Sequence, residues 1–308
     1  MPDQYLETAL VGNSDSTRNT YTVTLGKCLA VTKCKDSRAL LVGRANTFRK
    51  LVETWPNTNS LKKALSMLRS ILRTHPKIVP ATTAKYWRER FDDARAAVKE
   101  KNDNNVVSAA LQAKWMDYSD IKAKVQDLIK RGNEHASLKV TKELVILAMY
   151  AFLTPKRADF GKLRIVDSAD ELVATENGIV LPARGECKLV LNEYKTAKTY
   201  KQFVETLPSE LAQVLRASVK AFPRTFLLVG PRDKPLSNDN YGAHVKNTMD
   251  KHFDRKLTIN DLRHIYLTQT IILATITREE RNKIAWSMMQ SPEIQLEYVR
   301  TGAVTSDN

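Results

Sequence analysis

The sequence contains few of the residues that build disulfide frameworks or irregular chain conformations. Its 308 residues include only 3 Cys, 10 Gly and 11 Pro. Cys28, Cys34 and Cys187 are too few for a disulfide framework, and their spacing lacks the paired Cys/His pattern of a zinc site. The low Gly and Pro content excludes collagen-like and Pro/Gly-rich disordered chains. We therefore expect a folded chain with reduced thiols, no metal and no other cofactor.

Long apolar runs are also missing. No window approaches the roughly 18 uninterrupted apolar residues that a membrane span needs. The start of the chain, MPDQYLETALVGNSDS, lacks the basic-then-apolar order of a secretion signal. We therefore expect an intracellular protein that is neither secreted nor bound to a membrane.

Acidic residues are outnumbered by basic ones. The 34 Asp and Glu face 49 Lys and Arg, which gives a formal net charge of +15 and a pI near 9.6. Because binding to phosphates releases condensed counterions, a positive excess of this size favours a nucleic acid partner. The alternative is a generally basic protein without such a partner. Net charge indicates possible partners and says nothing about the fold.

The length and the 43% hydrophobic content fit two folded, mainly helical domains. Residues 1–15 are polar, and we expect a flexible N-terminus there. Amphipathic stretches that begin at Ser16 and recur at 37–54, 58–74 and 81–99 predict a compact helical domain over 16–105. The charged segment 99–106 is the candidate linker, and a solvated helix end is the alternative.

The second half of the chain, 106–308, has a different pattern. Helices are expected at 117–131 and 138–153, the latter apolar on nearly every side and therefore buried. Short apolar runs at 162–166, 178–181, 188–194 and 202–206, separated by turn residues, predict a small antiparallel β-sheet. The pattern is helical again at 209–221, 238–253, 259–274, 277–289 and 291–300.

Two segments of the second half carry basic residues at the ends of expected elements. TPKRADF (154–160) ends the buried helix, and its Arg157 offers a planar fork for phosphate oxygens. The alternative for Arg157 is an ion pair with Asp159 or a helix cap. LVLNEYKTAKT (189–199) runs from a strand into a turn with Lys195 and Lys198, which reach a cleft or form a solvated hairpin tip.

Two further segments follow near the C-terminus. In TINDLRHIYLT (258–268), Asn260, Arg263 and His264 are spaced i, i+3 and i+4, so we expect them to converge on one helix face. In IAWSMMQSPE (284–293), Gln290 is followed eight positions later by Tyr298. A tyrosine in an amphipathic C-terminal helix is also a common packing residue.

Together, and in this order, the four segments resemble the tyrosine recombinase (phage-integrase-like) superfamily over most of 114–302. The strings KRADF, YKTAKT and MMQSPEIQLEY look most like the branch of large DNA viruses and eukaryotic mobile elements. The resemblance implies a mainly α fold with a small antiparallel sheet. A helical core-binding domain would precede a mixed α/β catalytic domain, the two forming a C-shaped clamp around DNA.

The resemblance also implies a role for each matching residue. Arg157 and Arg263 would hold the oxygens of the scissile phosphate, and Lys195, or alternatively Lys198, would protonate the leaving 5′-oxygen. Tyr298 would attack phosphorus and form a 3′-phosphotyrosyl intermediate without metal or nucleotide. Asn260 and Gln290 stand where the family usually has His, or His/Trp, and an amide cannot shuttle a proton.

His264 either substitutes for the missing histidines or is a buried histidine hydrogen-bonded to backbone. The function implied is that of a site-specific recombinase or integrase acting in DNA recombination and DNA integration. Its partner would be double-stranded DNA, bound by DNA-dependent dimers or tetramers in a host nucleus, viral factory or cytoplasm. The alternatives are a catalytically impaired DNA-binding relative, a type IB topoisomerase, and a basic helical protein whose motif order is accidental.

Overall fold

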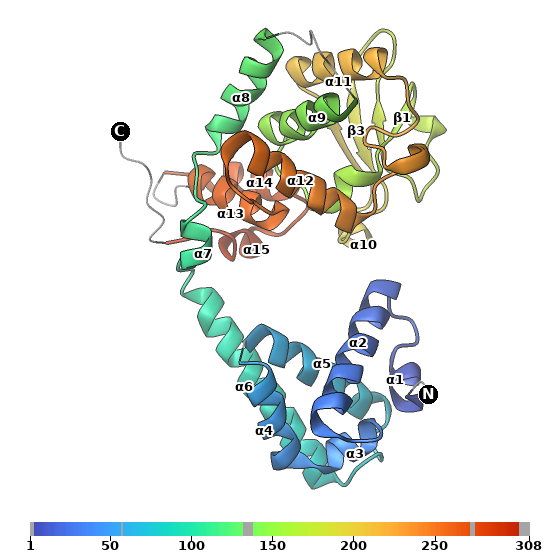
Figure 1. Ribbon diagram of the computed structural model, residues 1–308, viewed down its shortest axis with the longest axis vertical. Coiled ribbons are helices and arrows are strands. Elements are labelled where there is room, and N and C mark those ends of the chain that lie inside the picture. The colour runs from blue at the N-terminus through green and yellow to red at the C-terminus, as the bar shows by residue number, and fades with distance from the viewer. Residues whose placement is uncertain (1–2, 57, 132–137, 272–274, 302–308) are drawn as a thin grey trace. The chain divides into compact units, whose positions relative to one another are not determined.

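The computed structural model describes residues 3–56, 58–131, 138–271 and 275–301 (Figure 1). Contacts between residues divide the chain into two units, Met1–Asn104 and Asn105–Asn308, which we call unit 1 and unit 2. This boundary lies one residue before the one expected from the sequence. Within the described ranges, no helix combines the length and apolarity that a membrane crossing requires.

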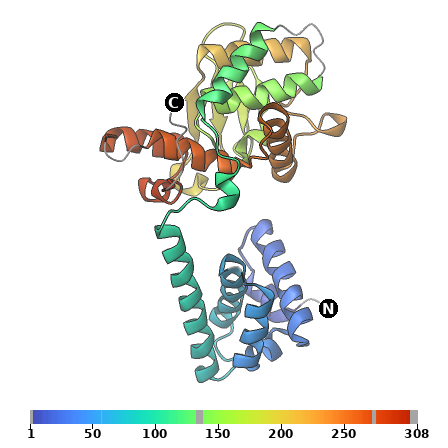
Figure 2. The same cartoon turned by 60° about the vertical axis from the view of Figure 1, so that its left-hand side comes forward.

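Unit 1 consists of helices in the part of the chain that the structure describes. They are α1 (Gln4–Ala9), α2 (Asp15–Thr32), α3 (Ser37–Val42), α4 (Arg44–Thr54), α5 (Thr58–Thr74) and α6 (Ala81–Asp103). Leu65, Leu68 and Ile71 recur on one face of α5 and are buried, because this spacing returns to the same side of a helix. Helix α5 packs along α6, the long helix that borders the unit in Figures 1 and 2.

For unit 1, the structure corrects one expectation and decides between two alternatives. Residues 1–15 were expected to be flexible, but Asp3 caps α1 by accepting from the Leu6 amide at 3.0 Å, and Leu6 and Leu10 are buried in the core. The sequence did not predict this short helix, because its few apolar residues stand in a mostly polar segment. The candidate linker 99–106 is helical as far as Asp103, so the alternative of a helix end describes most of it.

Unit 2 surrounds a buried central helix with further helices and a sheet. Its α-helices are α7 (Ala109–Gln112), α8 (Ser119–Lys130), α9 (Leu138–Phe152), α10 (Ala197–Tyr200), α11 (Ser209–Ala221), α12 (Asn238–Phe253), α13 (Ile259–Thr270), α14 (Arg278–Ser287) and α15 (Pro292–Leu296). Short 3₁₀ helices are η1 (Ala158–Lys162), η2 (Ala169–Glu171) and η3 (Pro231–Asp233). Helix α9 packs against α8, α11 and α12, which explains its nearly continuous apolar sequence (Figure 1).

The sheet of unit 2 has four strands in the order β1 (Arg164–Val166), β2 (Gly178–Val180), β3 (Lys188–Leu191), β4 (Phe203–Thr206). β2–β3 and β3–β4 are antiparallel, as expected, but β1 and β2 are parallel. The expectation of an antiparallel sheet was therefore wrong for this pair. The segment between them contains η2 and is long enough to return the chain to the same end of the sheet.

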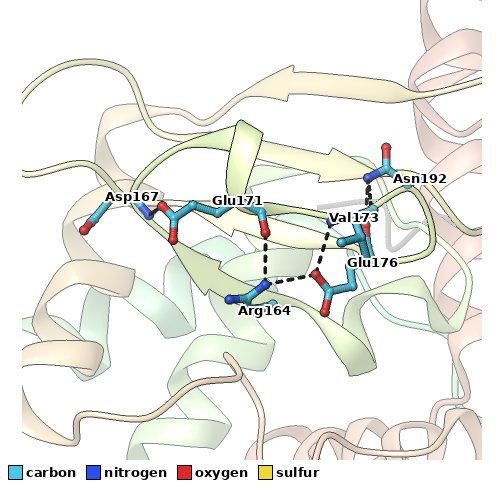
Figure 3. A network of polar contacts seen from close by, with 6 residues as sticks. All are labelled: Arg164, Asp167, Glu171, Val173, Glu176 and Asn192. Carbon is cyan, nitrogen blue, oxygen red and sulfur yellow. Dashed lines mark hydrogen bonds and ion pairs between the residues drawn. The ribbon is translucent and has the colours of Figure 1, made fainter.

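A polar network ties the loop before β2 to the end of β3 (Figure 3). Arg164 on β1 donates to the Glu171 carbonyl and to the Glu176 carboxylate, each at 3.0 Å. The side-chain amide of Asn192 donates to the carbonyls of Glu176, at 2.8 Å, and of Val173, at 3.3 Å. The loop thereby fixes Asn192, which stands three residues before Lys195.

Candidate active site

Three segments far apart in the sequence meet at the end of α9. The Thr154 hydroxyl donates to the Ser287 carbonyl at 3.0 Å and so joins this end to the end of α14. A guanidinium nitrogen of Arg263, on α13, donates to the Pro155 carbonyl at 2.5 Å. The backbone around Arg157 is thus held by α13 and α14 together.

Arg263 is completely buried, with 0% of its surface exposed. It extends from α13, which begins at a capping box formed by Thr258 and Asp261. Its second terminal nitrogen donates to the side-chain oxygen of Gln290 at 2.6 Å, while its Nε has no partner among the described residues. Because a guanidinium carries five N–H donors, these two bonds leave three for other acceptors.

Gln290 lies against Arg263 and not in solvent. Only 3% of its surface is exposed, and its amide oxygen is the acceptor for the Arg263 guanidinium. It follows the end of α14, and its backbone amide donates to the Ala285 carbonyl at 3.0 Å. The side-chain amide therefore holds Arg263 in place.

Tyr298 lies beside both arginines. It follows α15 in a turn, where its amide donates to the Gln295 carbonyl at 2.9 Å, whereas a helix over 291–300 was expected. The Arg263 guanidinium lies 4.8 Å from the centre of the Tyr298 ring. Burial raises the pKa of the phenol, but the charges of Arg263 and Arg157 and their hydrogen bonding to the hydroxyl outweigh it, so the pKa of Tyr298 is below its ordinary value.

Arg157 stands at the N-cap position of η1 and is half-buried. It makes no ion pair within 4.0 Å with any residue that the structure describes. Its charge, with that of Arg263, opposes the effect of burial, which raises the pKa of Asp159. Arg157 therefore occupies a cap position without a side-chain cap bond, and its guanidinium, which also bonds to the Tyr298 hydroxyl, has further N–H groups for an anion.

His264 faces the backbone of Tyr298. Its Nδ1 lies 2.8 Å from the Tyr298 carbonyl, and its Nε2 lies 3.2 Å from a guanidinium nitrogen of Arg300. Since a carbonyl only accepts and a guanidinium only donates, Nδ1 carries the proton and Nε2 is an acceptor. Burial, together with the charge of Arg300, lowers the pKa of His264 to about 4. His264 is thus a half-buried histidine bonded to backbone, and its ring also packs on the Tyr298 ring, with 4.8 Å between the ring centres.

Asn260 differs from the other two residues of its motif in its exposure to solvent. It is exposed near the start of α13, and its side chain makes no hydrogen bond to another residue within the described ranges. Arg263 points toward Gln290 and His264 toward the Tyr298 carbonyl. The three residues share the first turns of α13, as their spacing predicts, but they differ in exposure and partners, and their action on one phosphate stays a prediction.

The turn with the two candidate lysines is attached to the same site by its neighbour Thr196. The Thr196 hydroxyl donates to the Met289 carbonyl at 2.9 Å, one residue before Gln290. Lys195 and Lys198 are both exposed and make no ion pair with a described residue. The turn thus sits at the rim of the site with two free ammonium groups.

Asn177 supports the base of this turn. It is buried, its side-chain oxygen accepts from the amides of Asn192 and Glu193, and its nitrogen donates to the Glu193 carbonyl, all at 2.8 to 2.9 Å. In the sequence, Asn177 stands out only as a turn residue.

Lys156 is a buried cation that the sequence did not indicate. It is 0% exposed, donates to Glu205 at 2.9 Å and to Thr154 at 2.7 Å, and lies over the Phe203 ring at 4.9 Å. Burial lowers its pKa, and Glu205 partly offsets that effect. Its neighbour Arg157 was recognised, but nothing in the local pattern distinguishes a buried lysine from an exposed one.

Comparisons with known proteins agree with this architecture. No protein-family model and no curated protein matches the chain. A lambda integrase dimer bound to a COC′ core site aligns with 99% of this chain and 78% of its own, with a TM-score of 0.56 and 12% identity. A lambda integrase tetramer bound to a Holliday junction aligns over the same shares, with a TM-score of 0.52 and 11% identity.

The chain therefore has a fold similar to that of lambda integrase. The expected class, mainly α with a small sheet, is confirmed, with the sheet mixed and not purely antiparallel. The resemblance to the branch of large DNA viruses and mobile elements stays a prediction.

Proposed function

We propose that this protein is a tyrosine recombinase that cuts and rejoins double-stranded DNA through a 3′-phosphotyrosyl intermediate. The observation that carries the proposal is the environment of Tyr298, whose ring and hydroxyl lie beside the guanidinium groups of Arg263 and Arg157. A phenol with its ordinary pKa of about 10 is a poor nucleophile near neutral pH. Two fixed positive charges favour the phenolate, and they suit a phosphate that Tyr298 would attack.

In the proposed reaction, a bond forms between Tyr298 Oη and phosphorus as the bond from phosphorus to the 5′-oxygen breaks. The phenol loses its proton to water, and the leaving 5′-oxygen takes a proton from Lys195 or Lys198. A free 5′-hydroxyl then attacks the phosphotyrosine and releases Tyr298. The number of phosphodiester bonds is conserved, so the reaction needs no energy source. Arg157 and Arg263 stabilise the charge on the non-bridging oxygens during both steps.

Gln290 and Asn260 carry amide side chains, which do not transfer protons in the proposed reaction. Gln290 fixes the Arg263 guanidinium through its amide oxygen. Asn260 is exposed, where it is free to donate to a phosphate oxygen. General acid–base catalysis contributes roughly 10² to 10⁴ in rate, so we expect a slower enzyme than one with histidines at these positions.

DNA binding is proposed for both units, because each has more basic than acidic residues. The lambda integrase structures hold a dimer on a core site and a tetramer on a Holliday junction. By analogy of fold, we propose that this protein acts as DNA-dependent dimers or tetramers. Phosphate contacts would supply most of the affinity.

The direct test uses a nicked suicide DNA substrate, on which the cleaved strand is lost and the covalent protein–DNA adduct accumulates. Wild type should form the adduct, and Tyr298→Phe should form none while binding DNA nearly as well, because only a hydroxyl is removed. Tyr200→Phe, which changes another tyrosine of unit 2, is the matched control and should behave as wild type. An adduct formed by Tyr298→Phe would place the nucleophile elsewhere.

Arg263→Ala tests the proposed phosphate contact. The rate of adduct formation should fall by about 10² to 10³, the usual effect of removing one donor that stabilises a transition state. DNA binding should weaken too, because the charge acts on the bound phosphate in ground and transition states alike. Arg278→Ala removes an exposed arginine of α14 and is the control for loss of one charge. Equal rates in the two variants would contradict the role of Arg263.

A DNA-binding relative without turnover is the second candidate. The specific observation in its favour is that the two positions where the family usually has a proton-transferring side chain hold amides, Asn260 and Gln290. If wild type forms no adduct and the double variant Asn260→His/Gln290→His does, this second function replaces the first.

A further inference from the structure

The peptide that carries Tyr298 is attached to the first residues of unit 2. The Thr301 amide donates to the Asn105 carbonyl at 2.8 Å, and the Val107 amide donates to the Thr301 carbonyl at 3.1 Å. Val106 and Thr301 form a parallel β-bridge. All of these contacts lie within unit 2, directly after its boundary with unit 1.

The Asn105 side chain adds two hydrogen bonds, one to a residue before Tyr298 and one to a residue after it. Its Nδ2 donates to the Leu296 carbonyl at 3.0 Å, and its Oδ1 accepts from the Arg300 guanidinium at 3.3 Å. An amide supplies both a donor and an acceptor, as this pair of partners requires. Asn105 has a φ of +48°, and asparagine adopts this left-handed conformation more readily than most residues.

Arg300 extends the attachment to α13. Its guanidinium donates to the Glu297 carbonyl at 2.7 Å and to His264 Nε2 at 3.2 Å, and its backbone amide donates to the Thr268 hydroxyl at 2.9 Å. Tyr298 is thus held at Leu296 before it, at Arg300 after it, and at its own carbonyl by His264. Asn105 contacts the first two of these three points.

We propose that Asn105 is a positioning residue for Tyr298, and that the start of unit 2 holds the phenol beside Arg157 and Arg263. The inference rests on the proposed function of Tyr298 as a nucleophile. The position of the phenol can be tested without any activity, because a phenol held beside two guanidinium groups titrates differently from one that has moved away.

The test compares Asn105→Gly and Asn105→Asp in the full chain. Glycine tolerates the positive φ and keeps the backbone bond from Thr301, but it removes both side-chain bonds. Aspartate keeps an acceptor for Arg300 and loses the donor to Leu296. Val106→Ala, which shortens an exposed side chain of the same segment, is the matched control.

The first measurement is the titration of the Tyr298 phenol without DNA, followed by ¹³C NMR of tyrosine labelled at Cζ and assigned with Tyr298→Phe. In Asn105→Gly the pKa of Tyr298 should shift upward, toward or above its ordinary value. The second is adduct formation on the nicked substrate, which should slow by about 10- to 100-fold, as expected when a reacting group is misplaced by about 1 Å. Asn105→Asp should lie between Asn105→Gly and wild type in both measurements.

A role in stability alone would lower the melting temperature of Asn105→Gly but leave the Tyr298 titration equal to that of Val106→Ala, and this result would overturn the proposal. Should Asn105→Gly fail to fold, the titration of Asn105→Asp decides in the same way. If wild type forms no adduct, the proposed function fails, whereas the NMR titration still decides whether Asn105 positions Tyr298.

Discussion

The two units use their charges differently. Unit 1 has 19 Lys and Arg against 10 Asp and Glu in 104 residues, and unit 2 has 30 against 24 in 204 residues. The buried polar side chains of unit 1 are all Ser or Thr among the residues that the structure describes. Unit 2, in contrast, buries Lys156, Arg263 and Glu143. The more basic unit keeps its charges at the surface, and the less basic unit buries some of them around the candidate site.

This difference in the position of the charges suggests different roles for the two units, DNA binding for surface cations and catalysis for buried ones. Surface cations attract phosphates over long distances and do not disturb the core of the unit that carries them. Burying a cation costs free energy unless hydrogen bonds and opposite charges compensate it. Arg263 and Lys156 have such partners in Gln290 and Glu205. We infer that unit 1 contributes mainly to binding, whereas unit 2 keeps buried cations because the site requires them in fixed positions.

The largest expected effect concerns salt. If the protein contacts six to ten phosphates, its DNA affinity should fall by roughly 10³ to 10⁵ between 50 and 200 mM salt. Within unit 1, Arg69, Arg73 and Arg88 line one surface hollow of about 300 Å³. Arg73→Gln/Arg88→Gln should reduce the slope of log affinity against log salt by about 1 for each phosphate that the variant no longer binds.

Fluorescence anisotropy with a labelled duplex measures this slope. Arg278→Gln/Lys283→Gln, which removes two exposed charges from unit 2, gives the comparison. A flat salt response in wild type would contradict binding through surface cations altogether. A greater reduction of the slope by the unit 2 pair would contradict the assignment of affinity to unit 1.

The second expected effect is on stability and concerns the ion pair between the buried Lys156 and the partly exposed Glu205 of unit 2. Glu205→Ala leaves the Lys156 ammonium buried without its carboxylate, and removing one partner of such a pair typically costs about 3 to 5 kcal/mol. Lys156→Met/Glu205→Ala should recover much of this loss, because no charge is then left in the core. Urea unfolding of the single and double variants measures the free energy of unfolding.

The same double variant should lose activity although its stability recovers, if Lys156 helps to hold the backbone at Arg157. Leu68→Ala in unit 1 is the control for a stability loss of similar size, about 2 to 5 kcal/mol, that does not touch the site. Normal adduct formation by the stable double variant would show that this ion pair serves the fold alone.

The sequence predicted the parts of this fold that depend on local periodicity. Helices α11 and α12 begin and end where the apolar spacing indicated, and the apolar segment at 138–153 is the buried helix α9. The parallel pairing of β1 with β2 was missed because strand direction depends on how an eleven-residue connection crosses the sheet, and turn residues do not encode this.

The candidate site was predictable only in part, for a related reason. Motif order indicated Arg157, Arg263, Gln290 and Tyr298, and these residues lie close together. The contacts that orient them join positions such as Asn105 and Leu296 or Lys156 and Glu205, far apart in the sequence. The exposed position of Asn260 likewise follows from how α13 packs and not from its spacing to Arg263.

The smallest expected effect is on pH dependence and involves His264 of unit 2. Its pKa in the folded chain is about 4, below the ordinary 6.5, so between these values the unfolded chain binds more protons than the folded one. Stability therefore rises with pH through this window and is lost on acidification. From pH 7.5 to pH 5 this histidine should lower the free energy of unfolding by about 2 kcal/mol, since each pKa unit corresponds to about 1.4 kcal/mol.

Urea unfolding at the two pH values measures this change, with His264→Gln as the test and His75→Gln of unit 1 as the control. His264→Gln should lose about 2 kcal/mol less than wild type on acidification, because glutamine does not titrate. His75→Gln still contains His264 and should lose as much as wild type. If His264→Gln is as sensitive to acid as His75→Gln, then His264 is not held as a neutral ring between Tyr298 and Arg300. That result would weaken the comparison between the two units. In this comparison, unit 1 carries its charges at the surface, whereas unit 2 holds neutral and charged groups in fixed positions around Tyr298.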